Sequence, residues 1–157
     1  MDYQETAIRA VVERLNLESL KAVATRPGIQ SAYRIIVSYA DGRAYDSAST
    51  IIYITNQPHA IQETRYSGFL KNKAIKREID LVNYRRFVKT LQNIQFDSLH
   101  FPVSELLHAP TIWYIERATG QFSHAVLLNP HISEKPYVLL TNIIDGILPD
   151  AVREIRV

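Results

Sequence analysis

Apolar residues in this chain recur at two different periods, and the alternation between the two limits the folds that it can adopt. In residues 33–39, YRIIVSY, every second residue is apolar, which is typical of a strand with one buried face. Ile36 is an exception, because it is apolar at a position where the pattern expects a polar residue. Residues 50–55, TIIYIT, are β-branched and aromatic and also favour a strand. The Asp41-Gly42 pair between these segments predicts a tight hairpin turn that joins neighbouring antiparallel strands.

The amino-terminal segment has the helical period instead. Its apolar side chains form a stripe about 100° wide on a helical wheel, the width expected of a helix that packs on a core. The stripe consists of Ile8, Val11, Val12 and Leu15. Three further apolar residues, Leu17, Leu20 and Val23, lie off the stripe. We therefore expect the helix to bend or restart near Asn16 and to end at the TRPG sequence of residues 25–28.

A second helix is predicted from Leu81, with Asp80 as its amino-terminal cap. Its apolar residues share one broad face and are Leu81, Tyr84, Phe87, Val88, Leu91 and Ile94. Ile75 and Ile79 lie on the other side of the same wheel, so the segment before Asp80 is predicted to be extended or irregular rather than helical. Residues 65–70 are expected to add a third strand to the sheet.

The last third of the chain repeats the pattern of strands followed by a helix. Residues 108–130 predict two strands joined at the RATGQ sequence of residues 117–121. A terminal helix is expected to start at Pro136 and to stop at Gly146 or Pro149. The element order is then α-β-β-β-α-β-β-α. It predicts one α+β domain over residues 1–157, with an antiparallel sheet of about five strands and helices mainly on one face.

This element order is similar to that of the small dimeric chaperones of type III secretion systems. The similarity covers most of the chain and concerns only the order of helices and strands. It identifies no site residue in this chain. What it implies is a chaperone- or adaptor-like role in binding a partner protein.

Composition excludes several kinds of chemistry. With 46% hydrophobic and 22% charged residues among 157, the chain is typical of a globular protein. It has no cysteine, which excludes disulfides, cysteine-ligated zinc, iron–sulfur clusters and a thiol nucleophile. The longest apolar run, residues 137–148, is shorter than the roughly 20 residues that span a bilayer, and residues 1–16 lack the pattern of a secretory signal. We therefore expect a cytoplasmic protein without membrane contact, and we predict no cofactor.

Residues 65–89 form a basic stretch. They hold eight of the 18 Lys and Arg and two of the 16 acids in the chain. If residues 65–73 form a strand, alternate positions put cations and an aromatic ring on one face, an arrangement suited to single-stranded nucleic acid. The candidate nucleic-acid-binding residues are Arg65, Phe69, Lys71, Lys73, Arg85, Arg86 and Lys89.

The alternative interpretation of the basic stretch is an ordinary solvated surface. Arg85, Arg86 and Lys89 lie opposite the apolar face of their helix, so they point away from the sheet. Lys71 and Lys73 suit an edge strand, where lysine deters pairing with other chains. We expect the charge to fall on at least two separated surfaces, which makes nucleic-acid binding the lesser alternative.

The spacing of the polar residues predicts neither a metal site nor a nucleophile. The five histidines, His59, His100, His108, His124 and His131, form no metal-binding motif. His124 alternates with apolar residues on its predicted strand, which favours a hydrogen-bonded, partly buried imidazole. There is no Gly-x-Ser-x-Gly elbow and no phosphate-binding glycine loop. An enzyme whose site assembles only in space is a further alternative.

The terminal helix has more apolar residues than one core face requires. They cover nearly half of its circumference and are Leu139, Leu140, Ile143, Ile144, Ile147 and Leu148. Two interpretations are open: a deeply buried helix, or a surface covered in part by a partner protein or by a second copy in a homodimer. We predict a non-catalytic partner-binding or regulatory domain that uses this helix, with nucleic-acid binding through residues 65–89 and an enzyme as the alternatives.

Overall fold

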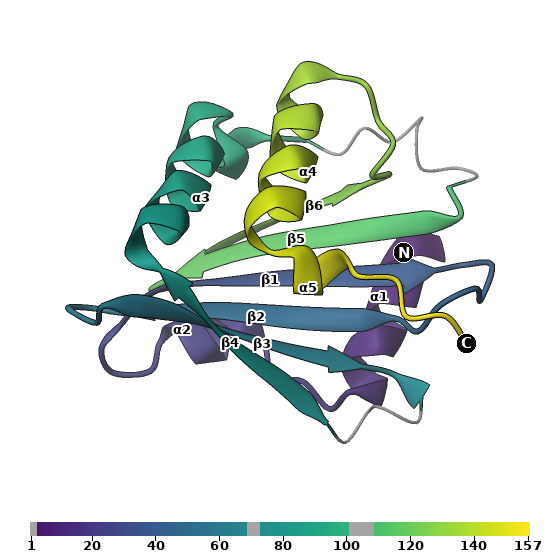
Figure 1. The fold of residues 1–157 in the computed structure, drawn as a ribbon, viewed down its shortest axis with the longest axis horizontal. Helices are drawn as coiled ribbons and strands as arrows, with labels where there is room; N and C mark the ends of the chain where they lie inside the picture. Colours follow the sequence, from purple (N-terminus) through teal and green to yellow (C-terminus); the bar gives the residue numbers. More distant parts are fainter. Residues whose placement is uncertain (1–2, 69–72, 101–108) are drawn as a thin grey trace.

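A single antiparallel sheet lies at the centre of the computed structural model, which describes residues 3–68, 73–100 and 109–157 (Figure 1). Its strands follow the order β4-β3-β2-β1-β5-β6. In chain order they are β1 (Ile29–Tyr39), β2 (Ser47–Ile54), β3 (His59–Tyr66), β4 (Ala74–Asp80), β5 (Thr111–Thr119) and β6 (Phe122–Leu128). The predicted α+β fold is confirmed, with a 6-stranded sheet in place of the expected five strands.

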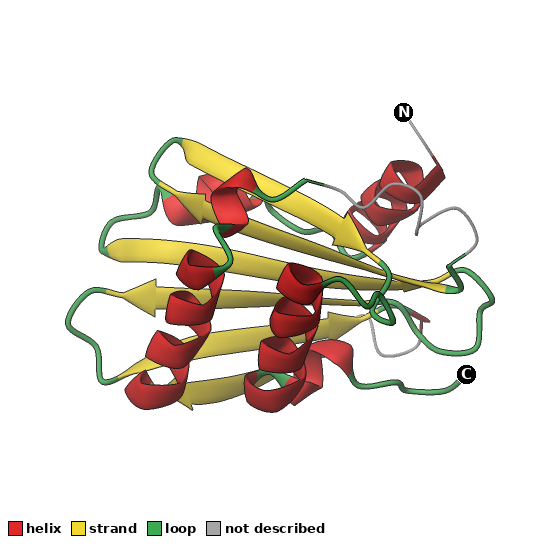
Figure 2. Cartoon of the chain, turned by 90° about the horizontal axis from the view of Figure 1, so that it is seen from above, coloured by secondary structure: helices red, strands yellow, loops and turns green. Residues whose placement is uncertain are grey.

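The sequence predicted helices mainly on one face of the sheet, but helices pack on both of its faces (Figure 2), because β1 has buried apolar side chains on both sides. One face, called here the α3/α4 face, is covered by α3 (Leu81–Asn93), α4 (Lys135–Ile147) and α5 (Pro149–Val152). A short 3-10 helix, η2 (Phe96–Ser98), follows α3. The opposite face, called the α1/α2 face, is covered by α1 (Tyr3–Arg14) and α2 (Leu20–Ala24). The element order therefore differs from the predicted one by the extra strand β4 and by the short helices.

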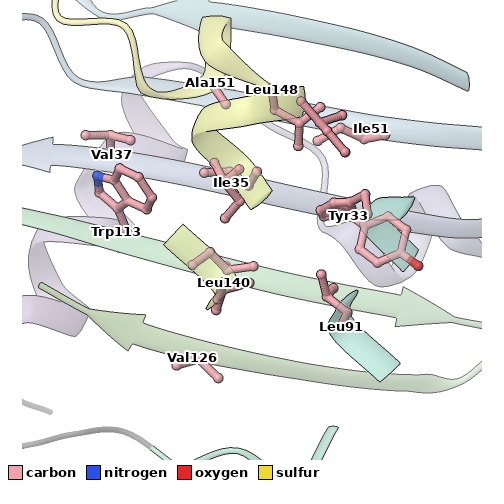
Figure 3. Close-up of a cluster of buried hydrophobic side chains, with 14 of the residues drawn as sticks. Tyr33, Ile35, Val37, Ile51, Leu91, Trp113, Val126, Leu140, Leu148 and Ala151 are labelled. Atoms are coloured by element: carbon pink, nitrogen blue, oxygen red, sulfur yellow. The ribbon is translucent and has the colours of Figure 1, made fainter. Parts of the chain in front are cut away.

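The largest hydrophobic cluster lies on the α3/α4 face (Figure 3). Strand β1 contributes Tyr33, Ile35 and Val37, each at most 2% exposed. Around them Figure 3 shows Ile51, Leu91, Trp113, Val126, Leu140, Leu148 and Ala151. Complete burial of one large apolar side chain contributes about 1.5–3 kcal/mol. The alternation in residues 33–39 is therefore one of the strongest determinants of the fold.

The α1/α2 face is also apolar, which explains why Ile36 breaks the alternation of β1. Ile36 is fully buried on this opposite face, in a cluster with Val11 of α1 and Ile112 of β5. Because β1 is central in a sheet covered on both faces, both sets of its side chains lie inside. The prediction of a half-buried strand is wrong for β1 for this reason.

Several predicted boundaries are confirmed by the local backbone. Asn16 takes a φ of 51° after α1, and the chain restarts as α2 four residues later at Leu20. The Asp80 side chain accepts a hydrogen bond from the Asn83 N–H at 2.8 Å and so caps α3. Gly120, with a φ of 55°, forms the turn between β5 and β6. These positions follow from short-range chemistry, which a sequence displays directly.

The strands at the β4 side of the sheet were predicted less well. The third strand was expected over residues 65–70, but β3 covers His59–Tyr66. Its inward-facing side chains are Ala60, Gln62, Thr64 and Tyr66, and the two polar residues at 0% exposure interrupt the apolar alternation that would mark a buried strand. The segment before Asp80, predicted to be extended or irregular, is strand β4, which pairs with β3. Ser67 and Gly68, also expected in the third strand, lie beyond the end of β3, and residues 69 and 70 lie outside the described residues.

The Asp41-Gly42 pair forms a turn between β1 and β2, but the connection is longer than a tight hairpin. Gly42 has a φ of 70°, and its N–H donates to the Tyr39 carbonyl at 3.1 Å. The β1–β2 ladder begins only after Ala44, which forms a bridge with Arg156 near the carboxyl terminus. The intervening residues are thus held by the carboxy-terminal segment rather than by the ladder.

Two charged residues, the buried Arg34 and the half-buried Glu116, lie next to each other on the α1/α2 face. Arg34 of β1, 4% exposed, donates to the Glu18 carbonyl at 2.5 Å and to the Thr50 hydroxyl at 3.1 Å. Glu116 of β5 lies opposite Arg34 in the strand register and accepts from the Tyr114 hydroxyl at 3.0 Å. Burial raises the pKa of Glu116, and the Tyr114 hydrogen bond and the Arg34 charge offset only part of that shift.

We expect Glu116→Gln to stabilise the protein near neutral pH. Folding raises the pKa of the Glu116 carboxyl above its ordinary value of 4.5. The folded protein therefore loses stability as the pH rises from 4.5 through the raised pKa, because the carboxylate forms less readily in the folded state than in the unfolded state. The neutral amide removes that loss, so the free energy of unfolding of the variant should increase relative to that of the parent as the pH rises. Urea unfolding between about pH 4 and pH 7 measures the difference.

Glu13→Gln, at an exposed site on α1, is the control for the same change in net charge. A difference between Glu116→Gln and the parent that stays constant with pH would show that the Glu116 carboxyl is not destabilised by burial.

Candidate functional site

Most of the predicted partner-binding residues of α4 are buried within the chain. Leu140, Ile144, Ile147 and Leu148 are at most 7% exposed and belong to the cluster on the α3/α4 face. Ile143 is half-buried against the same cluster, and Leu139 is 42% exposed. Packing between the sheet and α3 therefore accounts for the wide apolar arc of α4. Leu139 and part of Ile143 remain accessible.

The described cations of the basic stretch lie on two faces of the sheet. Those exposed on α3 are Arg85, Arg86 and Lys89. Arg65 lies opposite Ala48 in the β2–β3 register, and Ala48 belongs to the cluster beneath α1, so Arg65 is on the α1/α2 face. It pairs with Glu63 at 2.9 Å.

The remaining candidates for nucleic-acid binding add no shared surface. Lys73 is exposed immediately before β4. Phe69 and Lys71 lie outside the described residues. Among the candidates that the structure describes, only the three on α3 share a surface.

The described histidines do not gather into a metal site. His124 Nε2 donates to the Leu99 carbonyl at 2.9 Å, and its ring meets Phe96 edge-on at 5.6 Å, as the strand alternation predicted. His59 lies 3.5 Å from Glu78 across the β3–β4 pair. Within residues 3–68, 73–100 and 109–157, no three His, Asp or Glu lie close enough together to hold a metal ion.

A cleft of about 1000 Å³ lies between α3 and one end of the sheet. Its walls come from α3, from the residues of and around η2, and from the adjoining ends of β1, β2 and β5. Side-chain amides and hydroxyls contribute much of its lining, from Gln30, Ser31, Gln92, Asn93, Gln95, Ser98 and Thr119. The cleft is therefore a mixed polar and apolar surface rather than an apolar cavity.

Aromatic side chains form the inner wall of the cleft. Tyr53 of β2 stacks on Tyr84 of α3 with ring centroids 4.9 Å apart. Tyr33 meets Tyr84 edge-on at 6.3 Å and Phe87 edge-on at 5.1 Å. In Figure 3 the Tyr33 hydroxyl points away from Ile35 and the centre of the core. Tyr33 and Tyr84 are buried and Tyr53 is half-buried, so only Tyr53 offers part of its ring to a ligand.

Two irregularities of the backbone shape the cleft. The β1–β2 register shifts between Ile29 and Ser31, and the Gln30 carbonyl there accepts from the Thr119 hydroxyl at 3.0 Å. Gln95, between the C-cap residue of α3 and the start of η2, takes a left-handed φ of 54°. A non-glycine residue in this conformation costs about 1–2 kcal/mol, and here it turns the chain so that Asp97 of η2 returns to the cleft wall.

Positive charge dominates the cleft. Arg117 of β5 pairs with Asp97 at 2.9 Å. Arg85 and Lys89, one turn apart on α3, are exposed in the cleft wall and form no ion pair with any described residue. Arg86, on the same helix, is exposed but does not line the cleft; it donates to Asn83 at 3.2 Å.

The titratable groups of the cleft favour binding over acid–base chemistry. Burial raises the pKa values of Tyr33 and Tyr84, and the nearby Arg117 guanidinium offsets only part of either shift. Both phenols are therefore protonated at neutral pH. Among the described lining residues, the only carboxylate, Asp97, is engaged by Arg117. The exposed cations Arg85 and Lys89 are therefore the groups of the cleft that can hold an anionic ligand.

Sequence reasoning missed the cleft, although it named Arg85 and Lys89 for another reason. Tyr84 was predicted only as a core residue of its helix, and Arg117 only as part of a turn. Nothing in the spacing of Tyr53, Tyr84 and Arg117 brings them together, because three separate elements supply them. The excess of cations on α3 was the one available signal.

No known family model matches this chain, and no curated protein matches it either. None of the helices in the described part of the chain has the length and hydropathy needed to span a bilayer.

The two kinds of apolar residue on α4 should respond differently to truncation. We expect Ile144→Ala to lower the free energy of unfolding by about 2–5 kcal/mol, because it leaves a cavity in the core. Leu139→Ala should change it by less than about 0.5 kcal/mol, since the side chain is 42% exposed. Urea titrations measure both variants. Equal losses would contradict the packing of α4 described above.

Proposed function

We propose that this protein is a non-catalytic binding domain whose cleft holds an extended acidic segment of a partner protein. The observation that carries the proposal is the pair of exposed cations Arg85 and Lys89, which have no ion-pair partner among the described residues and border a cleft of about 1000 Å³. Arg117 adds a third positive group deeper in the same cleft. Carboxylates of a bound segment would pair with these groups.

The rest of the lining fits a peptide backbone. A peptide in extended form presents both N–H donors and carbonyl acceptors, and the side-chain amides of Gln30, Gln92 and Gln95 can serve either. The half-buried ring of Tyr53 supplies an apolar surface for a side chain of the segment. A mixed lining of this kind suits a polypeptide better than a small apolar ligand.

The same details make nucleic acid the less favoured ligand. Stacking of bases needs exposed aromatic faces, but Tyr33 and Tyr84 are at most 7% exposed, which leaves only part of Tyr53. Arg65, on the opposite face of the sheet, cannot extend a phosphate track from α3.

The other expected surfaces support the proposal less. The accessible apolar part of α4 is reduced to Leu139 and part of Ile143, a smaller area than a stable protein interface uses. An enzyme would need a base or nucleophile, and the described lining of the cleft has protonated phenols and a paired carboxylate instead. A cytoplasmic location remains part of the proposal.

Binding of a fluorescein-labelled peptide of alternating glutamate and leucine tests the proposal by fluorescence anisotropy. We expect the double variant Arg85→Glu/Lys89→Glu to bind it roughly tenfold more weakly than the parent, because two exposed ion pairs of up to about 1 kcal/mol each are lost. Arg86→Glu is the matched control, because it reverses a charge on the same helix outside the cleft. It should bind within about twofold of the parent.

Two further probes separate the alternatives. A peptide of alternating lysine and leucine should not bind, and a single-stranded oligothymidylate should bind weakly and lose its affinity as salt rises. The proposal would be contradicted if Arg86→Glu weakened peptide binding as much as Arg85→Glu/Lys89→Glu, or if the glutamate and lysine peptides bound with equal affinity. Oligothymidylate binding that is submicromolar and survives physiological salt would favour the nucleic-acid alternative instead.

A further inference from the structure

Strand β4 is an edge of the sheet with an uncovered outer side. It is the outermost strand on the side away from β6, and within the described residues it pairs with β3 alone (Figure 1). Residues 74–78 are all exposed. An edge strand of this length presents backbone N–H and carbonyl groups that another strand can pair with.

The sequence of β4, AIKREID, complements itself when it is read in the opposite direction. In an antiparallel pair of two copies related by a two-fold axis at Arg77, Lys76 of each copy lies opposite Glu78 of the other. Ile75 lies opposite Ile79, and Ala74 lies opposite Asp80. The pairing thus forms two Lys–Glu pairs on one face and two isoleucine pairs on the other, which are the favourable kinds of cross-strand neighbour.

Other two-fold registers of the same strand are less favourable. An axis at Lys76 places two lysines opposite each other, and an axis at Glu78 places two glutamates opposite each other. Both registers also leave part of the strand unpaired, whereas the axis at Arg77 uses all 7 residues. Each of these three registers has one like-charged pair at its axis, so the length of the pairing is what favours the axis at Arg77.

Only Arg77 meets a like charge in this register. Its guanidinium lies 3.5 Å from an oxygen of Asp150 within its own chain, and Asp150 is also paired with Arg153 at 2.6 Å. The Asp150 carboxylate directs Arg77 toward α5 and offsets part of the repulsion between the two copies. Ile75, 42% exposed in the single chain, becomes covered by the second copy.

We propose that two copies of this chain associate through β4, in an antiparallel pairing centred on Arg77 that joins their sheets into one. The surface shares no residue with the cleft, so this assembly is independent of the proposed function. Seven residues from each copy form an interface smaller than a standard stable one, which has about 20–30 residues a side, so we expect a dissociation constant of roughly 10–100 µM.

Single cysteines can map this register, since the natural chain has none. Residues directly opposite each other have Cα atoms about 4.5–5.5 Å apart, within the range of a disulfide, whereas positions offset by two residues are about 7–8 Å apart. Arg77→Cys should therefore form a covalent dimer under mild oxidation. Val82→Cys, at a site 69% exposed on α3, measures the rate of cross-linking that random collisions alone produce.

The substitution Arg77→Cys also removes the repulsion between the two Arg77 side chains, so a second cysteine experiment keeps Arg77 in place. Lys76→Cys mixed with Glu78→Cys should cross-link at least several-fold faster than either variant alone, because only the mixed pair is directly opposed. Cross-linking of both the Arg77→Cys chain and the mixed pair at the rate of Val82→Cys would overturn the proposal. Equal rates for the mixed pair and for each variant alone would overturn the register.

Charge reversal tests the same register without cross-linking. In sedimentation experiments over roughly 1–300 µM, Lys76→Glu should weaken association about tenfold, because both Lys–Glu pairs become repulsive. The swap Lys76→Glu/Glu78→Lys restores complementarity and should return the affinity to within about threefold of the parent. Urea unfolding checks the swapped chain, since Lys76 also lies 3.9 Å from Glu63 and Glu78 lies 3.5 Å from His59. A folded parent that is monomeric throughout this range, or a swap that fails to restore association, would contradict the proposal.

Discussion

Burial of β1 on both of its faces is the constraint on which the rest of the structure depends. Ile35 packs toward α3 and α4 while Ile36 packs toward α1, and both are 0% exposed. A strand with no solvent face needs a strand on either side and helices above and below. The ladder to β5 and the placement of the terminal helices follow from that need, although these elements lie far away along the chain.

Apolar burial decreases from β1 toward β4, and polar side chains take its place. Gln62 and Thr64 of β3 are fully buried, and no described group satisfies the Gln62 Oε1 atom. An unsatisfied buried acceptor costs about 1–3 kcal/mol unless a water molecule reaches it. The β3–β4 side is thus the less stabilised part of the sheet.

The cleft and the β4 edge lie close in sequence but use different chemistry. Asp80 ends β4 and caps α3, so the strand that would pair with a second copy leads directly into the helix that carries Arg85 and Lys89. Pairing through β4 would therefore hold two cationic clefts in a fixed relation. A partner with two acidic segments would then bind with a higher effective concentration at the second cleft.

What the sequence by itself determined was local: the Asp80 cap, the break at Asn16 and the alternation of residues 33–39, all of which depend on neighbours within a few positions. It also marked α3 as unusually cationic. Tertiary structure alone decided that Ile36 and Arg34 lie inside and that β3 has polar residues on its buried face. It also decided that Tyr53, Tyr84 and Arg117 meet in one cleft. Such outcomes depend on which elements cover a surface, and that information is distributed over the whole chain.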